Sequence, residues 1–269
     1  MLLFAANLSL LFTELPFVQR IDAAARAGFD AVECQFPYGV DAAELRAGLD
    51  GCGLAMFMHN LPAGDWAAGE RGIACLPGRE SEFRAGVAQG VTSARALGVK
   101  RLNCLAGVPG PEVPPQLAHE TLVANLRFAA HVLADAGMTL LVEPLNSVDV
   151  PGFFLTRSAQ VLDILDEVGA VNAMLQFDLY HAQRMEGDLS TTLARHLPRI
   201  GHIQIADCPG RHEPGSGELH WDFLFEQLDR LGWRTPIGCE YIPRDGTTQG
   251  LEWLQAARAR LAQTTPTST

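Results

Sequence analysis

The feature that most constrains this chain is an alternation of eight short apolar segments with eight helix-length segments along its length. Each apolar segment has the near-continuous hydrophobic character of a buried parallel strand, and no linker-like break interrupts the series. Eight such units in 269 residues predict an α/β fold with one domain, a (β/α)8 TIM barrel. A doubly wound open sheet is the alternative. That fold often carries a glycine-rich phosphate loop after its first strand, and the segment NLSLLFTEL there contains no glycine.

The boundaries of the expected elements follow from the apolar periodicity and from capping residues. Strands are expected at 2–7, 30–36, 54–60, 100–107, 138–144, 173–181, 199–207 and 236–242. Helices are expected at 16–29, 42–53, 81–98, 111–137, 158–169, around 189–197, at 222–232 and at 247–263, with Asp41 and Thr156 as N-caps of the second and fifth. The barrel domain is thus predicted to span 1–262, followed by a polar tail at 263–269.

The overall composition excludes several classes of protein. A net charge of −11 disfavours a surface that binds nucleic acid or an anionic membrane. Six scattered cysteines without a CxxC pair predict reduced, buried thiols and a cytoplasmic protein. The apolar N-terminus lacks the basic region of a signal peptide, and no apolar run reaches the roughly 20 residues that span a bilayer.

Four strands in the second half of the chain end in residues with side-chain oxygens. The segments are LLVEP with Glu143, LQFDLYH with Asp178, HIQIAD with Gln204 and IGCEY with Glu240. In a barrel the carboxyl ends of all strands meet on one face, so these side chains are expected to converge. The alternative for each carboxylate taken alone is an ion pair with a basic residue of the barrel, but only Lys100 and Arg101 lie close to a strand.

Three carboxylates and an amide oxygen form a set of hard ligands. Such a set suits Mg²⁺, with Mn²⁺ as the second choice, whereas zinc normally uses more His or Cys. We therefore expect Glu143, Asp178, Gln204 and Glu240 to hold a divalent metal, and we expect no organic cofactor. A metal of this kind can stabilise the enediolate formed when a proton is removed next to a carbonyl. Glu143 and Glu240 are the natural pair to move that proton between neighbouring carbons.

Four further residues are candidates for substrate binding. His59 ends the third expected strand, and His181 follows Asp178 by three residues. Arg71 lies in a long Gly/Pro-rich loop and Arg211 in a second one, and either guanidinium can bind a carboxylate in a forked geometry. The structural alternatives are histidines bonded to backbone and solvated loop arginines.

The chain resembles the hydroxypyruvate isomerase family, within the xylose isomerase-like barrels. The motifs that carry the resemblance run over nearly the whole chain: ANLSLLF, HNLPAGDWAAGERGIACLPGRE, EPLN, PGFFLT, QFDLYHAQRMEG, GHIQIAD, EPGSGEL and GCEY. The resemblance implies conversion of hydroxypyruvate to tartronate semialdehyde (2-hydroxy-3-oxopropanoate), a reaction of carbohydrate-acid and glyoxylate metabolism. It implies that Glu143 and Glu240 are proton donor and acceptor, and that both are metal ligands together with Asp178 and Gln204. Many members of the superfamily have His at the position of Gln204, and this departure favours Mg²⁺.

Several other functions are compatible with the same residues. A 2-oxo-tetronate isomerase would perform the same proton transfer on a four-carbon acid, and a keto-sugar 3-epimerase would use the same two glutamates. A non-catalytic sugar-acid binding protein needs no acid–base pair, which Glu143 and Glu240 supply. A metal-dependent phosphodiesterase or DNA-repair enzyme would need more histidine ligands and a basic groove. The expected partner is a small 2-oxo acid, with no nucleic acid and no membrane, and a homo-oligomer stays compatible with the sequence.

Overall fold

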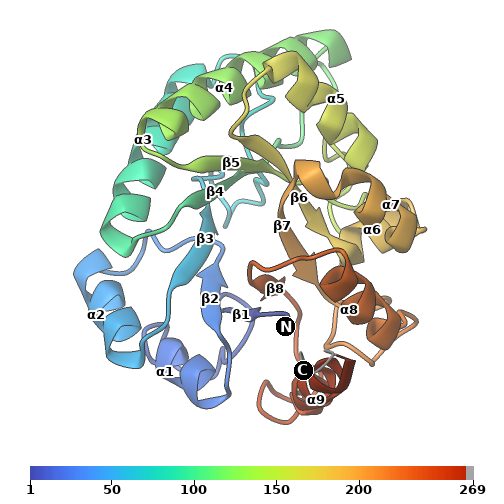
Figure 1. Ribbon diagram of the computed structural model, residues 1–269. Helices are drawn as coiled ribbons and strands as arrows, with labels where there is room; N and C mark the ends of the chain where they lie inside the picture. The colour runs from blue at the N-terminus through green and yellow to red at the C-terminus, as the bar shows by residue number, and fades with distance from the viewer. Residues whose placement is uncertain (265–269) are drawn as a thin grey trace.

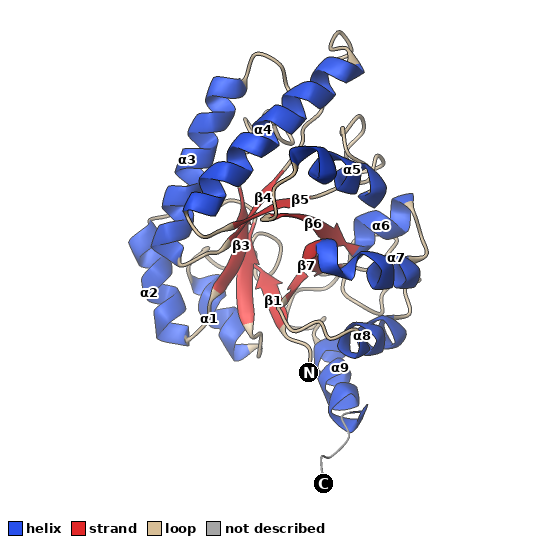
Figure 2. Cartoon of the chain, turned by 45° about the horizontal axis from the view of Figure 1, so that its top comes forward, coloured by secondary structure: helices blue, strands red, loops and turns tan. Residues whose placement is uncertain are grey.

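A computed structural model describes residues 1–264 and shows a closed barrel of eight parallel strands in sequence order, β1 to β8. Figures 1 and 2 show these strands at the centre with the helices around them. The barrel predicted from the alternation is therefore confirmed. The strands are β1 Phe4–Asn7, β2 Ala31–Cys34, β3 Met56–Asn60, β4 Arg101–Cys104, β5 Thr139–Val142, β6 Ala173–Asp178, β7 Ile200–Ile205 and β8 Ile237–Cys239.

Nine α-helices occur in the described part of the chain, one more than the sequence predicted. They are α1 Gln19–Arg26, α2 Ala42–Cys52, α3 Glu80–Leu97, α4 Pro115–Asp135, α5 Ser158–Val168, α6 Leu179–Met185, α7 Leu189–His196, α8 Trp221–Arg230 and α9 Glu252–Thr264, with a 3₁₀ turn η1 at Leu197–Arg199. The helices lie outside the strands, and their apolar side chains complete one continuous hydrophobic core.

The additional helix α6 corrects the predicted end of the sixth strand. The apolar run through His181 indicated one strand, but β6 ends at Asp178. The Asp178 carboxylate accepts the backbone N–H of Tyr180 at 2.9 Å and so acts as the N-cap of α6. His181 consequently lies in the first turn of a helix rather than in a strand.

The two predicted N-caps have different outcomes. Asp41 accepts the backbone N–H groups of Ala43 and Glu44 and caps α2 as predicted. The prediction of Thr156 as the cap of α5 is wrong, because the N-cap is Arg157. The side chain of Gln160 accepts the N–H groups of both residues, so the cap is formed by the third residue of the helix reaching back.

Helix α9 continues through Thr264, one residue beyond the predicted helix end at 263, and residues 265–269 of the predicted tail lie outside the described residues. The predicted division into a domain at 1–262 and a tail at 263–269 stays a prediction. Among the residues that are described, none of the helices combines the length and apolarity required to cross a bilayer.

The loops after β3 and β4 are joined over the carboxyl end of the barrel. An antiparallel bridge pairs Gly72 with Ala106, and the N–H of Cys75 donates to the Ala106 carbonyl at 2.8 Å. Gly72 has a φ of +110°, and a Cβ there would lie 2.3 Å from the carbonyl oxygen of Leu105, so only glycine fits. This contact positions the long loop that contains Arg71 at the mouth of the barrel.

Candidate active site

A cavity of about 200 Å³ opens at the carboxyl ends of the strands. Five of the residues predicted from the sequence line it: Glu143, Glu240, Arg71, His181 and Arg211. They come from five separate segments, namely the ends of β5 and β8, helix α6, and the loops after β3 and β7. The volume lies below the roughly 300–1,000 Å³ of pockets for drug-sized ligands, so the cavity suits a small substrate.

Two of the three buried carboxylates of the site, Glu240 and Asp178, pair with the guanidinium of Arg211. Its Nη2 lies 3.1 Å from Glu240 Oε2 and 3.4 Å from Asp178 Oδ2, and its Nε donates to the Glu240 carbonyl at 3.3 Å. The Asp178 carboxylate contacts Arg211 and His181, which line the cavity, but Asp178 does not itself line the cavity. The third carboxylate, Glu143, makes no ion pair within residues 1–264.

Burial raises the pKa of each of these three carboxyl groups. The pKa of Glu143 lies well above its ordinary value because of desolvation, with further contributions from the charges of Glu240 and Asp178. Desolvation also raises the pKa of Asp178 to about 7, although Arg211 opposes the shift. The pKa of Glu240 is raised by burial in the same way, again against the effect of Arg211. Carboxyl groups with pKa values raised toward neutrality are suited to general acid–base catalysis.

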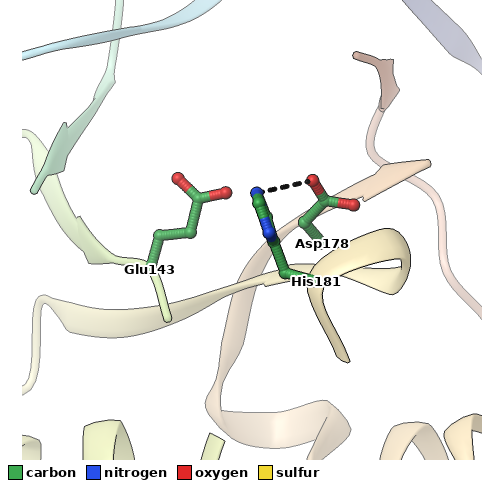
Figure 3. A group of neighbouring side chains, drawn as sticks. All are labelled: Glu143, Asp178 and His181. Carbon is green, nitrogen blue, oxygen red and sulfur yellow. Dashed lines mark ion pairs between the residues drawn. The ribbon is translucent and has the colours of Figure 1, made fainter. Parts of the chain in front are cut away.

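His181 presents its Nε2 to the carboxylates. The imidazole ring lies between Glu143 and Asp178, with Nε2 3.6 Å from Asp178 Oδ2 (Figure 3). Burial holds the pKa of His181 well below its ordinary value, and the positive charges of Arg211 and Arg184 add to this effect. A neutral histidine at this place can donate a hydrogen bond to a substrate oxygen without changing the charge of the site.

Amide side chains hold the two glutamates in place. Asn103 donates to Glu143 Oε2 at 2.8 Å and to Asn60 Oδ1 at 3.1 Å, and Gln35 donates to Glu240 Oε1 at 2.8 Å. These three amides were not among the site residues predicted from the sequence, because the ligand set was taken from the second half of the chain and His59 was the one candidate taken from a strand end in the first half. The same signal would have found them, since Gln35 follows β2, Asn60 ends β3 and Asn103 lies in β4.

Gln204 lies deeper in the barrel, and both ends of its amide are occupied. Its Oε1 accepts from Gln176 at 2.6 Å, and its Nε2 donates to Glu33 Oε1 at 2.7 Å. Glu33 is also bonded to Asn7 and, at 2.7 Å, to His202. An amide oxygen has two lone pairs, so Oε1 of Gln204 can accept from Gln176 and still offer a lone pair to a metal. The metal-binding role of Gln204 stays a prediction.

His59 lies outside the cavity lining, unlike its neighbour Asn60. The pairing of β2 with β3 shifts by one residue before His59, and this bulge changes which side chains face the barrel interior. The His59 ring packs against Tyr38, its Nδ1 lies 2.9 Å from the Asn60 carbonyl, and burial lowers its pKa to about 4. A contact between His59 and substrate would need a rearrangement of β3. Asn60, and not His59, lines the cavity at the end of this strand.

Arg71 faces the cavity from the loop after β3. Its guanidinium stacks on Trp66, with the Cζ atom 4.0 Å from the ring centroid, and Trp66 packs on Phe36. Its hydrogen bonds to the described residues run through Nη1 to the carbonyl groups of Trp66 and Glu70. Nε and Nη2 are thus left to bind an anion in the cavity.

A divalent cation fits this set of donors by charge and by ligand type. Arg211 pairs with Asp178 and Glu240 and balances one of the three negative charges that are present when these two groups and Glu143 are ionised. A divalent cation would balance the remaining two charges. Glu143 Oε1 is buried and has no hydrogen-bond partner in residues 1–264. Among the described residues, Glu143, Asp178 and His181 each offer a ligand atom within 4.8 Å of the others, and Glu240 is a further carboxylate bound to Arg211. Carboxylate oxygens of this kind suit Mg²⁺ or Mn²⁺.

Comparison with known proteins gives a consistent family. Residues 21–257 match the family model described as xylose isomerase-like TIM barrel. The chain is 50% identical to hydroxypyruvate isomerase of Escherichia coli K12, covering 96% of this chain and 100% of that protein. It is 49% identical to 2-oxo-tetronate isomerase of Cupriavidus necator, covering 94% and 97%. A solved structure from Brucella melitensis, described as AP endonuclease, family 2, superimposes with a TM-score of 0.92 at 42% identity, covering 95% of this chain and 99% of that one.

Proposed function

The chain belongs to the xylose isomerase-like TIM barrel family and is an isomerase of that family, and from this premise we propose that it interconverts hydroxypyruvate and tartronate semialdehyde. The observation that carries the proposal is the pair Glu143 and Glu240. Both are buried, both have raised pKa values, and both line one small cavity from the non-adjacent strands β5 and β8. Two such groups around a bound substrate can exchange protons with neighbouring carbons.

Arg71 is proposed to bind the substrate carboxylate. Its Nε and Nη2 form the fork that a planar carboxylate accepts, and the stack on Trp66 fixes the plane of the guanidinium. Arg211 is proposed to contact a substrate oxygen from the opposite wall while it balances Glu240 and Asp178. The two arginines would thus orient a short acid with its reacting carbons near the glutamates.

The proposed chemistry moves one proton between two carbons. One glutamate removes a proton from C3 of hydroxypyruvate, which leaves an enediolate across C2 and C3. The other glutamate, which starts protonated, gives its proton to C2, and the hydroxyl proton passes from the C3 oxygen to the C2 oxygen. The first glutamate then releases its proton to solvent and the second takes one up, so that atoms and charge balance over the cycle. His181 donates from Nε2 to the oxygen on which negative charge develops, which lowers the barrier among buried side chains.

A divalent metal, Mg²⁺ by preference, would supply Lewis-acid polarisation of the substrate carbonyl. Glu143, Asp178 and Glu240 would hold it, with the second lone pair of Gln204 Oε1 as a fourth ligand. Asn103 holds Oε2 of Glu143 and leaves the buried Oε1 without a hydrogen-bond partner among residues 1–264, while Gln35 holds Oε1 of Glu240. These amides fix the orientation of both carboxyl groups while protons are transferred.

The test is proton NMR in D₂O with hydroxypyruvate and the variants Glu143→Gln and Glu240→Gln. The two-base mechanism predicts product with deuterium at C2, and a loss of roughly 10²–10⁴-fold in kcat for each variant. The variant that retains the base for C3 should still exchange C3 protons for deuterium without forming product, which assigns the two roles. Glu186→Gln is the control, since Glu186 lies at the end of α6 outside the cavity lining and bonds Ser158. Near-normal turnover by either active-site variant would refute the two-glutamate mechanism.

A 2-oxo-tetronate isomerase is the second candidate, supported by the relative from Cupriavidus necator at 49% identity. The four-carbon acid differs by one hydroxymethylene group, and it is tested in the same tube by comparing kcat/KM for the two acids. Keto-sugar 3-epimerisation is tested in the same way. A DNA-repair role finds no support in the net charge of −11. Turnover of none of these compounds by folded, Mg²⁺-loaded protein would favour a sugar-acid binding protein.

The six cysteines are unpaired, and five of them are buried. This supports the proposal that the protein works in a reducing compartment, the cytoplasm.

A further inference from the structure

The side of His181 that faces away from the cavity is held by Asn146, a residue of the EPLN motif for which no role was predicted from the sequence. The backbone N–H of Asn146 donates to His181 Nδ1 at 3.1 Å, and the side-chain Nδ2 of Asn146 lies 2.7 Å from the same atom. Both residues are buried, so bulk water does not compete for Nδ1. A backbone N–H can only donate, and Nδ1 must therefore be the acceptor.

The amide of Asn146 cannot be reversed without losing several hydrogen bonds. Its Oδ1 accepts the backbone N–H groups of Val148 and Asp149, at 3.1 and 2.8 Å. Its Nδ2 donates to Asp149 Oδ2 at 3.0 Å. These contacts identify the atom that faces His181 as the amino nitrogen, a second donor to Nδ1.

Asp149 is itself held by helix α6. Tyr180 donates its hydroxyl to Asp149 Oδ2 at 2.8 Å, and Arg184 Nη1 lies 3.3 Å from that hydroxyl. The chain of contacts therefore runs from α6 through Asp149 and Asn146 and returns to His181 on the same helix. It joins the loop after β5 to the element that carries the histidine.

From these contacts we propose that Asn146 is a positioning residue that fixes His181 as the tautomer with hydrogen on Nε2. In this tautomer an N–H, and not a lone pair, faces Glu143, Asp178 and the cavity (Figure 3). His181 then donates a hydrogen bond to the substrate and is not a metal ligand, although its Nε2 lies within 4.8 Å of oxygens of both carboxylates. The role of His181 as a donor to the substrate rests on the proposed isomerase function. The assignment of the tautomer does not depend on that function.

The tautomer can be measured directly by long-range ¹H–¹⁵N NMR of the full chain with labelled histidine, free of substrate and metal. His181 is assigned by the signals lost in His181→Gln. We expect Nδ1 to resonate as an unprotonated ring nitrogen and Nε2 as a protonated one. A protonated Nδ1 in the wild-type protein would overturn the proposal, and this result needs no variant and no substrate.

The variant Asn146→Asp replaces the donor that faces Nδ1 by an acceptor. We expect the Nδ1 signal to move toward that of a protonated nitrogen, with kcat reduced roughly 10–100-fold and KM changed far less. Asn146→Leu removes only the side-chain donor and keeps the backbone donor, so the Nδ1 signal and kcat should change in the same direction but by less. This second variant tests the proposal if Asn146→Asp does not fold. Asn172→Asp is the matched control, because Asn172 precedes β6 and bonds the carbonyl groups of Ala130 and Met138.

An unchanged His181 spectrum in the folded Asn146 variants would refute the role of Asn146. An altered spectrum with unchanged kcat would refute the link between tautomer and turnover. If the wild-type protein turned over none of the proposed acids, the proposed function would fail, yet the NMR result would still decide the tautomer.

Discussion

Asp178→Asn is expected to make the metal-free protein more stable at neutral pH while it weakens the site. The Asp178 carboxylate is buried beside Glu240 and Glu143, and Arg211 compensates only part of its desolvation. Asparagine has the same shape and retains an oxygen that can accept the N–H of Tyr180. The substitution therefore removes a buried charge and keeps the cap of α6.

The magnitude follows from the shift in pKa. Burial raises the pKa of Asp178 from 3.8 to about 7, and each unit corresponds to about 1.4 kcal/mol, so the ionised carboxylate costs about 4 kcal/mol at pH 8. Because the folded pKa lies above the unfolded one, the folded state binds the proton more tightly. The penalty is absent below the unfolded pKa, grows between about pH 4 and 7, and is complete above the folded pKa.

The assay is urea unfolding in EDTA across this pH range. The free energy of unfolding of the variant should exceed that of the wild type by up to about 4 kcal/mol at pH 8, and the difference should shrink as the pH falls toward 4. Asp207→Asn is the matched control. Asp207 is equally buried, but it accepts four hydrogen bonds from backbone N–H groups and the Trp221 indole. Its substitution should destabilise by roughly 1–3 kcal/mol, because asparagine turns an amino group toward some of these donors.

Two results would refute this reasoning. One is an Asp178→Asn variant that is less stable than the wild type at pH 8 without metal. The other is a stability difference that does not change with pH, because the effect would then not come from ionisation of Asp178.

Two further predictions concern the ligands of the site. Arg71→Leu should raise KM for the acid by roughly tenfold or more with a smaller change in kcat, because a charge-assisted hydrogen bond contributes about 1.5–3 kcal/mol. An unchanged KM in steady-state assays would exclude Arg71 from carboxylate binding. Mg²⁺ should raise the Tm of the wild-type protein in a concentration-dependent way, because a ligand that binds only the folded state stabilises that state. The Tm of Asp178→Asn should rise much less. Equal shifts of the two Tm values in scanning calorimetry would argue against Asp178 as a ligand.

The barrel and the meeting of the carboxylates could be predicted from local patterns. Apolar periodicity identified the strands, and parallel strands in a closed barrel must end on the same face, so Glu143 and Glu240 had to approach one another once the fold was given. Asp41 was recognisable as a cap for the same reason, since a cap depends on neighbours within one turn of helix. The catalytic and metal-binding roles of the strand-end residues stay predictions.

The partner of each side chain was decided only by the tertiary structure. The register of β6 and β7 places Gln176 against the oxygen of Gln204, a contact that no local pattern in the sequence indicates. A shift in the pairing of β2 and β3 moved His59 out of the cavity and left Asn60 in it. Nothing local to Asn146 indicates that it bonds His181, 35 residues away. Strand and helix periodicity arises from contacts close in sequence, whereas register, bulges and hydrogen-bond partners depend on how distant segments pack.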